Sequence, residues 1–93
     1  MSGRRPPQPR ALAAKALIRV ERGGYANLVL AGLLRESGLS ARDRAFASRL
    51  TYGTLERLRT LDARLAPFLK KPIRRLDPEV RTALRLGLYQ MLY

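Results

Sequence analysis

Apolar side chains recur at every third or fourth position over most of this 93-residue chain, the spacing that gathers them on one face of an α-helix. We expect a first helix to begin at Pro9, because proline is well tolerated in the first turn, and to end at the glycines of positions 23 and 24. A second helix, short and very apolar, is expected from Asn27 to Gly38, a residue that readily adopts the positive φ of a helix C-cap.

The third predicted helix is the longest. Ser40 is a favourable N-cap residue, and Asp43 three positions later forms an approximate capping box with it. Since no proline follows before Pro67, the pattern predicts one continuous helix to about Leu65. A fourth helix is expected to begin at the Asp-Pro-Glu sequence of residues 77–79, which combines an N-cap, a first-turn proline and an acid near the positive end of the helix dipole. It should continue to the last residue.

No segment alternates apolar and polar residues in the way that predicts a β-strand, so the predicted fold class is all-α. Residues 1–8 consist mostly of Gly, Ser, Arg, Gln and Pro and can bury little apolar surface, so we expect a disordered basic tail there. Residues 9–93 are expected to form a single helical domain.

The fourth predicted helix is apolar around most of its circumference, and Arg81, Arg85 and Gln90 mark its narrow polar strip. A helix of this kind belongs in the interior of a structure. Three preceding helices, one of them short, can cover only one side of it. We therefore expect it to pack against further helices absent from this chain, or against a second copy of the chain.

The charge balance indicates a class of partner. The chain has 19 Lys and Arg against 7 Asp and Glu, a net charge of +12, and 16 of the 19 cations are arginine. The planar guanidinium group suits phosphate, so nucleic acid is the leading partner class. The alternative is that arginine is abundant because GC-rich coding sequence favours it, with the surplus charge solvated over the whole surface.

Nine cations are candidates for contacting an anion. On a helical wheel of residues 42–65, four arginines spaced by seven, eight and seven positions lie within about 80° along one border of the apolar face. Like charges at such spacings repel one another, so a bound anion would account for them. Equally, arginine can lay its methylene groups along the edge of a core. The first predicted helix and the tail before it carry the other five. The candidates are Arg4, Arg5, Arg10, Lys15, Arg19, Arg42, Arg49, Arg57 and Arg64.

Gly53 is a candidate for close helix packing, and two tyrosines are candidates for contacting RNA bases. Gly53 lies beside the apolar face of the third predicted helix, where glycine costs about 1 kcal/mol relative to alanine, so we expect a neighbouring helix to approach it closely. Tyr25 and Tyr52 are the candidates for stacking on unpaired bases, although packing would explain either residue equally well.

Two missing residue types limit the chemistry. The chain contains no cysteine and no histidine, which excludes zinc sites of the usual kind, Cys or Ser-His triads and histidine acid–base catalysis. We expect no catalytic residue, no metal site and no cofactor in this chain. No apolar run approaches the roughly 20 residues that span a bilayer, and no signal-peptide pattern follows the basic N-terminus. We therefore expect no membrane partner and a cytoplasmic location.

Several motifs carry a family resemblance. The stretch LTYGTLERLRTLDARLAPFLKKPIRRLDPEVRTALRLGLYQMLY resembles the N-terminal, NusB-fold RNA-binding domain of the Sun/Fmu-type rRNA cytosine-C5 methyltransferases, and RALAAKALIRVERGG, YANLVLAGLL and GLSARDRAFASRL are also similar to it. The resemblance covers residues 10–93. It implies a NusB-like helical bundle that is truncated here after the fourth helix. It also implies a separate catalytic domain, with S-adenosylmethionine and catalytic cysteines, that maps onto no residue of this chain.

The resemblance extends to the NusB antitermination proteins, in which an arginine-rich N-terminus and first helix contact RNA and a ribosomal protein docks nearby. It implies RNA contacts at the matching cations here, where Pro6 and Pro7 interrupt the denser arginine run of those proteins. The matching cations are Arg4, Arg5, Arg10, Lys15 and Arg19.

These observations favour an RNA-binding module of an rRNA methyltransferase that contacts the phosphates of RNA, with rRNA as the expected RNA, through an arginine-rich surface. The alternative is a protein-interaction or antitermination-type adaptor that uses the apolar fourth helix. Its partner would be a missing C-terminal domain, a second copy, or a ribosomal or transcription protein. DNA binding through a helix-turn-helix is less favoured, because the third predicted helix is long and its first turn offers no Asn or Gln.

Overall fold

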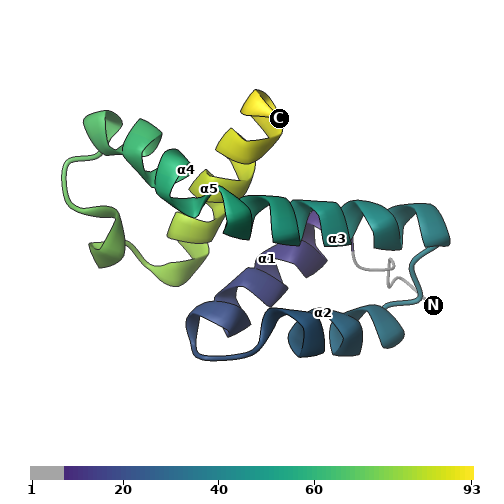
Figure 1. Cartoon of the computed structure of the whole chain (residues 1–93). Helices are drawn as coiled ribbons and strands as arrows, with labels where there is room; N and C mark the ends of the chain where they lie inside the picture. The colour runs from purple at the N-terminus through teal and green to yellow at the C-terminus, as the bar shows by residue number, and fades with distance from the viewer. Residues whose placement is uncertain (1–7) are drawn as a thin grey trace, which may run out of the picture.

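The computed structural model describes residues 8–93, and within that range it contains five α-helices and no β-strand (Figure 1). The predicted all-α fold class is confirmed. No helix of the described range is long and apolar enough to cross a membrane. The elements are α1 (Pro9–Glu21), α2 (Ala26–Arg35), α3 (Ala41–Glu56), α4 (Leu58–Leu65) and α5 (Pro78–Leu92), with 3-10 turns η1 (Ala66–Phe68) and η2 (Ile73–Arg75) between α4 and α5.

Local sequence signals place most helix ends where they were expected. Pro9 is the first residue of α1, preceded by Gln8 at the N-cap position, which is the one part of the predicted tail that the structure describes. Positive φ angles of 109° at Gly23 and 71° at Gly38 let the chain turn after α1 and α2. The Ser40 hydroxyl accepts a hydrogen bond from the Asp43 backbone N–H at 3.2 Å, so the predicted cap of α3 is confirmed.

The prediction of one continuous helix to Leu65 is wrong, because the helix breaks at Arg57. The backbone there has φ −113° and ψ 19°, and the Arg57 N–H is shared between the carbonyls of Gly53 and Thr54, each at 3.2 Å. Beyond the break α4 leaves the line of α3 and lies against α5, where Leu61 is fully buried (Figure 1). The predicted third helix is therefore two helices, and the change of direction lets the second contact α5.

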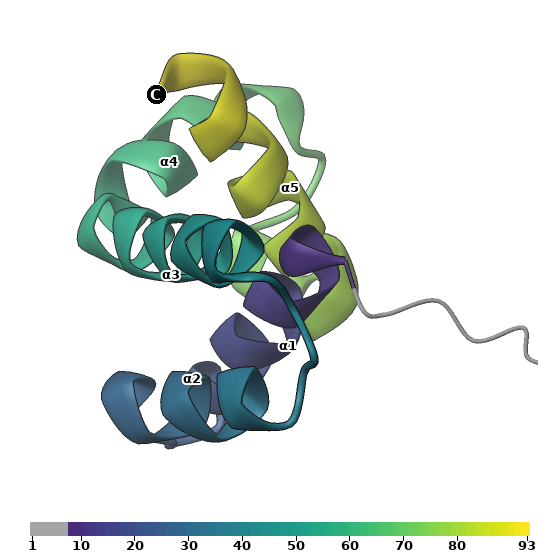
Figure 2. The same ribbon diagram turned by 90° about the vertical axis from the view of Figure 1, so that its right-hand side faces the viewer.

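The core consists of two clusters on either side of α1. Helix α1 contacts α2, α3 and α5, and α3 runs in nearly the same direction as α2 but crosses α1 and α5 (Figures 1 and 2). The first cluster joins α1, α2 and α3, and the second joins α1, α3 and α5. The first comprises Leu12, Ala16, Leu30 and Ala47, and the second comprises Ala13, Leu17, Leu50 and Leu86.

Gly53 has the structural role that was expected of it. A side chain at this position of α3 would clash with the ring of Tyr89 on α5, so glycine is what lets the two helices approach. Tyr89 itself packs against the second core cluster. The close approach lets α5 cross α3 in contact with it (Figure 1).

The polar strip of α5 forms ion pairs with α1 and α4. Arg81 donates two hydrogen bonds to the Glu21 carboxylate, one of them from Nε to Oε2 at 3.0 Å. Arg85 binds Asp62 of α4 through Nε and Nη2, both at 2.8 Å, and reaches Glu21 Oε2 at 3.4 Å. The hydrogen bonds from Arg81 are the main reason that the pKa of Glu21 lies below its usual value. Two of the arginines in this basic chain are thus internally neutralised.

Arg81 also fixes the connection between α4 and α5. It is 9% exposed, and its Nη1 donates to three backbone carbonyls, at 2.5 to 3.4 Å, in the segment just before α5. These carbonyls belong to Ile73, Arg74 and Leu76. The segment therefore depends on Arg81 more than on packing, since neither 3-10 turn contains a buried residue.

Several large apolar side chains of α5 and of η1 stay exposed. They lie on surfaces that α1, α3 and α4 do not cover, as expected for a helix that is apolar around most of its circumference. With their exposed fractions they are Phe68 (84%), Val80 (47%), Met91 (82%), Leu92 (39%) and Tyr93 (56%).

Candidate nucleic-acid interface

Three helix ends meet around two adjoining hollows, which together we call the basic groove. The N-terminal end of α1, the N-terminal and middle turns of α3 and the C-terminal end of α5 supply the lining side chains, and the two hollows share Arg10, Phe46 and Arg49. The first hollow, of about 590 Å³, is lined by Gln8, Pro9, Arg10, Ser40, Arg42, Asp43, Phe46 and Arg49. The second, of about 370 Å³, is lined by Arg10, Phe46, Arg49, Leu50, Tyr89, Gln90 and Tyr93.

Two guanidinium groups lie over one aromatic ring where the hollows join. The Cζ atoms of Arg10 and Arg49 are 5.3 and 5.6 Å from the centroid of the Phe46 ring, within the range of a cation–π interaction. Arg10 also donates from Nε to Gln90 Oε1 at 2.6 Å, which ties α1 to α5. The aromatic ring and the amide therefore hold these two cations in place before any ligand arrives.

A second cation–aromatic pair stands at the edge of the second hollow. The Cζ of Arg57 lies 4.0 Å from the centroid of the Tyr93 ring. Tyr93 in turn stacks on Tyr89, with ring centroids 5.4 Å apart and the planes inclined by 28°. Arg57 is the residue at which the helix breaks, so the break also places a cation beside the aromatic rings of α5.

The groove is strongly positive. Its lining residues include Arg10, Arg42 and Arg49 but one carboxylate, Asp43, and Arg57 lies at the edge. The first hollow also lies at the N-terminus of α3, where the helix dipole and free backbone N–H groups favour an anion. Phosphate-sized anions fit this charge and these donors.

The structure brings together three of the nine predicted cations, Arg10, Arg42 and Arg49, and places Arg57 beside them. Arg4 and Arg5 lie outside the described residues. The other three lie elsewhere. Because Arg64 is on α4 beyond the helix break, the single row of four arginines predicted for a continuous helix does not form. Lys15 lines a separate hollow between α1 and α2, Arg19 is exposed in the last turn of α1, and Arg64 is exposed on α4 beyond the break.

Sequence reasoning missed the aromatic part of the groove. Tyr25 and Tyr52 were the aromatic candidates, and Phe46, which also packs against the second core cluster, was not among them. Tyr25 occupies the N-cap position of α2 without a side-chain capping hydrogen bond, and neither candidate lines the two hollows. Phe46 and Tyr93 line the same hollow because α5 approaches α3, and Gly53 was the sequence signal for that approach.

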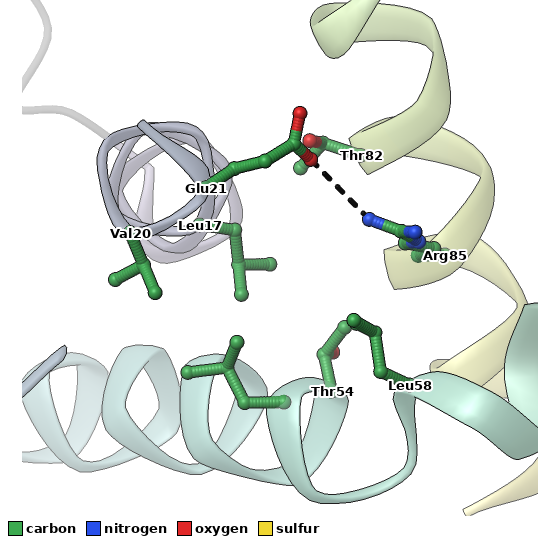
Figure 3. Close-up of a pocket in the computed structure, with 8 residues that line it drawn as sticks. Leu17, Val20, Glu21, Thr54, Leu58, Thr82 and Arg85 are labelled. Atoms are coloured by element: carbon green, nitrogen blue, oxygen red, sulfur yellow. Dashed lines mark hydrogen bonds and ion pairs between the residues drawn. The ribbon is translucent and has the colours of Figure 1, made fainter. Parts of the chain in front are cut away.

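A smaller cavity of about 140 Å³ lies on the other side of the second core cluster, between α1, α3 and α5 (Figure 3). Its walls are mostly apolar, and the Glu21–Arg85 ion pair lies at one side of it. The buried hydroxyl of Thr54 has no hydrogen-bond partner within residues 8–93. Because the charges of Arg85 are already paired, this cavity offers nothing to a phosphate. No group of three metal-binding side chains gathers in the described range either.

The fold and groove define an all-helical domain with a cationic, aromatic-lined surface. The NusB family matches residues 7–93, so the chain belongs to the NusB family. The resemblance to the NusB domain of rRNA methyltransferases, which the sequence motifs indicated, is confirmed by the relatives described below.

Two relatives illustrate the range of the family. The chain is 54% identical over 84 residues to the ribosomal RNA small subunit methyltransferase B of Thermus thermophilus, covering 90% of this chain and 21% of that protein. It is 37% identical over 71 residues to the transcription antitermination protein NusB of Xylella fastidiosa, covering 76% of this chain and 45% of that protein. The chain thus spans about a fifth of the length of the methyltransferase. No solved structure matches it.

Proposed function

We propose that this chain is the RNA-binding module of an rRNA cytosine-C5 methyltransferase and that its basic groove contacts RNA phosphates. The observation that carries the proposal is the convergence of Arg10, Arg42 and Arg49 on one groove, with Arg57 at its edge. Membership of the NusB family and the name of the Thermus thermophilus relative support rRNA as the RNA.

The local electrostatics support the same proposal. The two arginines of α5 are paired with Glu21 and Asp62, whereas the groove arginines face a single carboxylate, Asp43. Unpaired cations held in place by an aromatic ring lose little entropy when they bind phosphate, so affinity is gained with little reorganisation. Contacts of this kind give affinity with little reading of sequence.

We propose no catalytic role for the chain itself. The methyltransferase relative is almost five times as long as the part that the chain matches, so methyl transfer and the binding of S-adenosylmethionine are proposed for that further length. The role of the module is to hold the RNA substrate beside the catalytic domain.

Charge reversal in the groove tests the proposal. The double variant Arg42→Glu/Arg49→Glu should bind an rRNA fragment at least 100-fold more weakly in fluorescence anisotropy. It should also reduce the slope of log K against log[salt] by about 1.5, because each lost phosphate contact removes roughly 0.7–0.9 from that slope.

The matched control is Arg59→Glu/Arg75→Glu, which changes the net charge equally at exposed positions outside the groove. Equal losses in the two double variants would show that net charge, and not the groove, accounts for binding. Unchanged affinity in a folded Arg42→Glu/Arg49→Glu variant would refute the groove as the RNA site.

The exposed apolar side chains of α5 favour a second candidate function, a protein-interaction or antitermination-type adaptor. Met91 is 82% exposed and Val80 47%, and the Xylella fastidiosa relative is named as an antitermination protein. The partner would be a further domain, a second copy, or a ribosomal or transcription protein. Sedimentation equilibrium together with binding of a hydrophobic dye tests this candidate: a monomer that binds no dye would contradict it.

A further inference from the structure

The cavity between α1, α3 and α5 lies beside the helix break and is lined mainly by aliphatic side chains (Figure 3). Leu55 comes from the last turn of α3 and Leu58 is the first residue of α4, so residues on both sides of the break contribute to its wall. Leu17 and Val20 of α1 face them across the cavity. These walls favour the apolar part of a ligand.

Thr54 gives the cavity one unsatisfied polar group. It lines the cavity and is 0% exposed, and its hydroxyl has no hydrogen-bond partner among residues 8–93. Thr51, one turn earlier on α3 and equally buried, donates to the Ala47 carbonyl at 2.8 Å, as a threonine within a helix commonly does. Figure 3 shows the Thr54 side chain rising from α3 into the space between the helices. Since buried polar groups normally have a partner, a molecule in the cavity would supply the missing one.

The charged groups at one side of the cavity are already paired. Both carboxylate oxygens of Glu21 accept hydrogen bonds from Arg81, and Oε2 also accepts from Arg85 Nη1 at 3.4 Å. The Nε and Nη2 atoms of Arg85 are bound to Asp62. A charged ligand would lose its hydration here and find no free counter-charge, so the cavity favours an uncharged molecule.

The size of the cavity separates water from a larger occupant. Its volume of about 140 Å³ has room for several waters, but each buried water needs roughly two to four polar partners, and the Thr54 hydroxyl is a single group. By comparison, an apolar cavity of about 150 Å³ in another protein stays dry and binds benzene. The cavity therefore has the size for one ring.

We propose that this cavity is a binding site for a small uncharged molecule made of one apolar ring and one hydrogen-bonding group, and that this group pairs with the Thr54 hydroxyl. Phenol has this composition and serves as the probe. The cavity shares no lining residue with the basic groove, so the proposal does not depend on RNA binding.

The test titrates the whole 93-residue chain with phenol and, separately, with toluene, which has a methyl group in place of the hydroxyl. Thr54→Val removes the hydroxyl and nearly keeps the shape of the side chain. Thr51→Val is the matched control, since Thr51 is equally buried but does not line the cavity. Circular dichroism checks that both variants fold. Affinities are measured by NMR from the shifts of the methyl groups of Leu17, Val20, Leu55 and Leu58.

Both molecules should produce saturable shifts of these methyl groups in the unaltered chain. Thr54→Val should weaken the binding of phenol about 3- to 10-fold, the effect expected for loss of one neutral hydrogen bond. Its affinity for toluene, and both affinities of Thr51→Val, should change less than about twofold. Val20→Phe places a ring in the cavity from a half-buried position and should prevent the binding of both molecules.

Shifts that do not saturate, or that persist in a folded Val20→Phe variant, would overturn the cavity as a binding site. Equal affinities of phenol for the unaltered chain and for Thr54→Val would overturn the pairing with Thr54, and the proposed ligand class with it. None of these results bears on RNA binding, which the Arg42→Glu/Arg49→Glu variant tests separately.

Discussion

Replacement of Glu21 by alanine should destabilise the fold more than any other single change at a carboxylate of this chain. Glu21 is the last residue of α1, and it is the group that pairs with Arg81 and reaches Arg85. Without it, Arg81, whose side chain is 11% exposed, would keep its contacts to backbone carbonyls but lose its carboxylate. An unpaired charge that is nearly buried is costly.

The expected loss in the free energy of unfolding depends on how exposed the Glu21–Arg81 ion pair is. Breaking a buried ion pair costs roughly 3–5 kcal/mol. The Glu21 side chain is 32% exposed, so water screens the pair and relaxes around the arginine that remains. We therefore expect a loss of about 2 kcal/mol in the free energy of unfolding. For a chain of this size that corresponds to a fall of about 8–16 °C in melting temperature.

Glu56→Ala is the matched control. Glu56 is the last residue of α3, it is exposed, and it makes no ion pair within the described residues. Both substitutions remove a carboxylate from the unfavourable end of a helix dipole, so this effect cancels in the comparison. Urea unfolding followed by circular dichroism at 222 nm gives both free energies. A difference between the two variants below about 0.5 kcal/mol would refute the role assigned to the Glu21–Arg81 pair.

Three further predictions concern stability. Gly53→Ala should destabilise the chain by about 1–3 kcal/mol through its clash with Tyr89, yet stabilise it by about 1 kcal/mol in a Tyr89→Ala background; a double-mutant cycle without coupling would contradict this. Because the pKa of Glu21 is lowered by folding, its contribution is present above the unfolded value of about 4.3 and lost as pH falls through the folded pKa. The stability gap between the unaltered chain and Glu21→Ala should therefore shrink in acid titrations, and a gap that stayed constant below pH 4 would argue against the pair. Ser40→Ala should cost about 1 kcal/mol by removing the N-cap of α3, measured by urea unfolding against Ser48→Ala, and equal losses would count against the cap.

Helix ends were predictable where a single residue determines the backbone. Pro9, Gly23, Gly38 and Ser40 act within one turn of the chain, through ring geometry, positive φ or a local hydrogen bond. The helix break at Arg57 could not be predicted in this way, because no residue at that position disfavours a helix. It follows from the packing of α4 on α5, which joins segments that are distant in the sequence.

The part of the candidate site that lies on one helix was also predictable, whereas the part that depends on helix packing was not. Arg42 and Arg49 are seven positions apart on one helix, so their shared face could be predicted from periodicity alone. Arg10 and Tyr93 reach the groove from the two ends of the described chain, through the packing of α1 and α5 on α3. Likewise, Glu21 and Arg81 are 60 residues apart, and nothing local identified them as partners.

The most direct test of RNA binding through the basic groove is a salt series with the unaltered chain, an rRNA fragment containing an unpaired loop, and duplex DNA of equal length. Four arginines on phosphate predict tight binding to the RNA and a slope of log K against log[salt] of about −3. Binding to the DNA should be markedly weaker. Weak and equal binding to both, with a slope near −1 or less in magnitude, would contradict the account and leave the exposed face of α5 as the better indication of function.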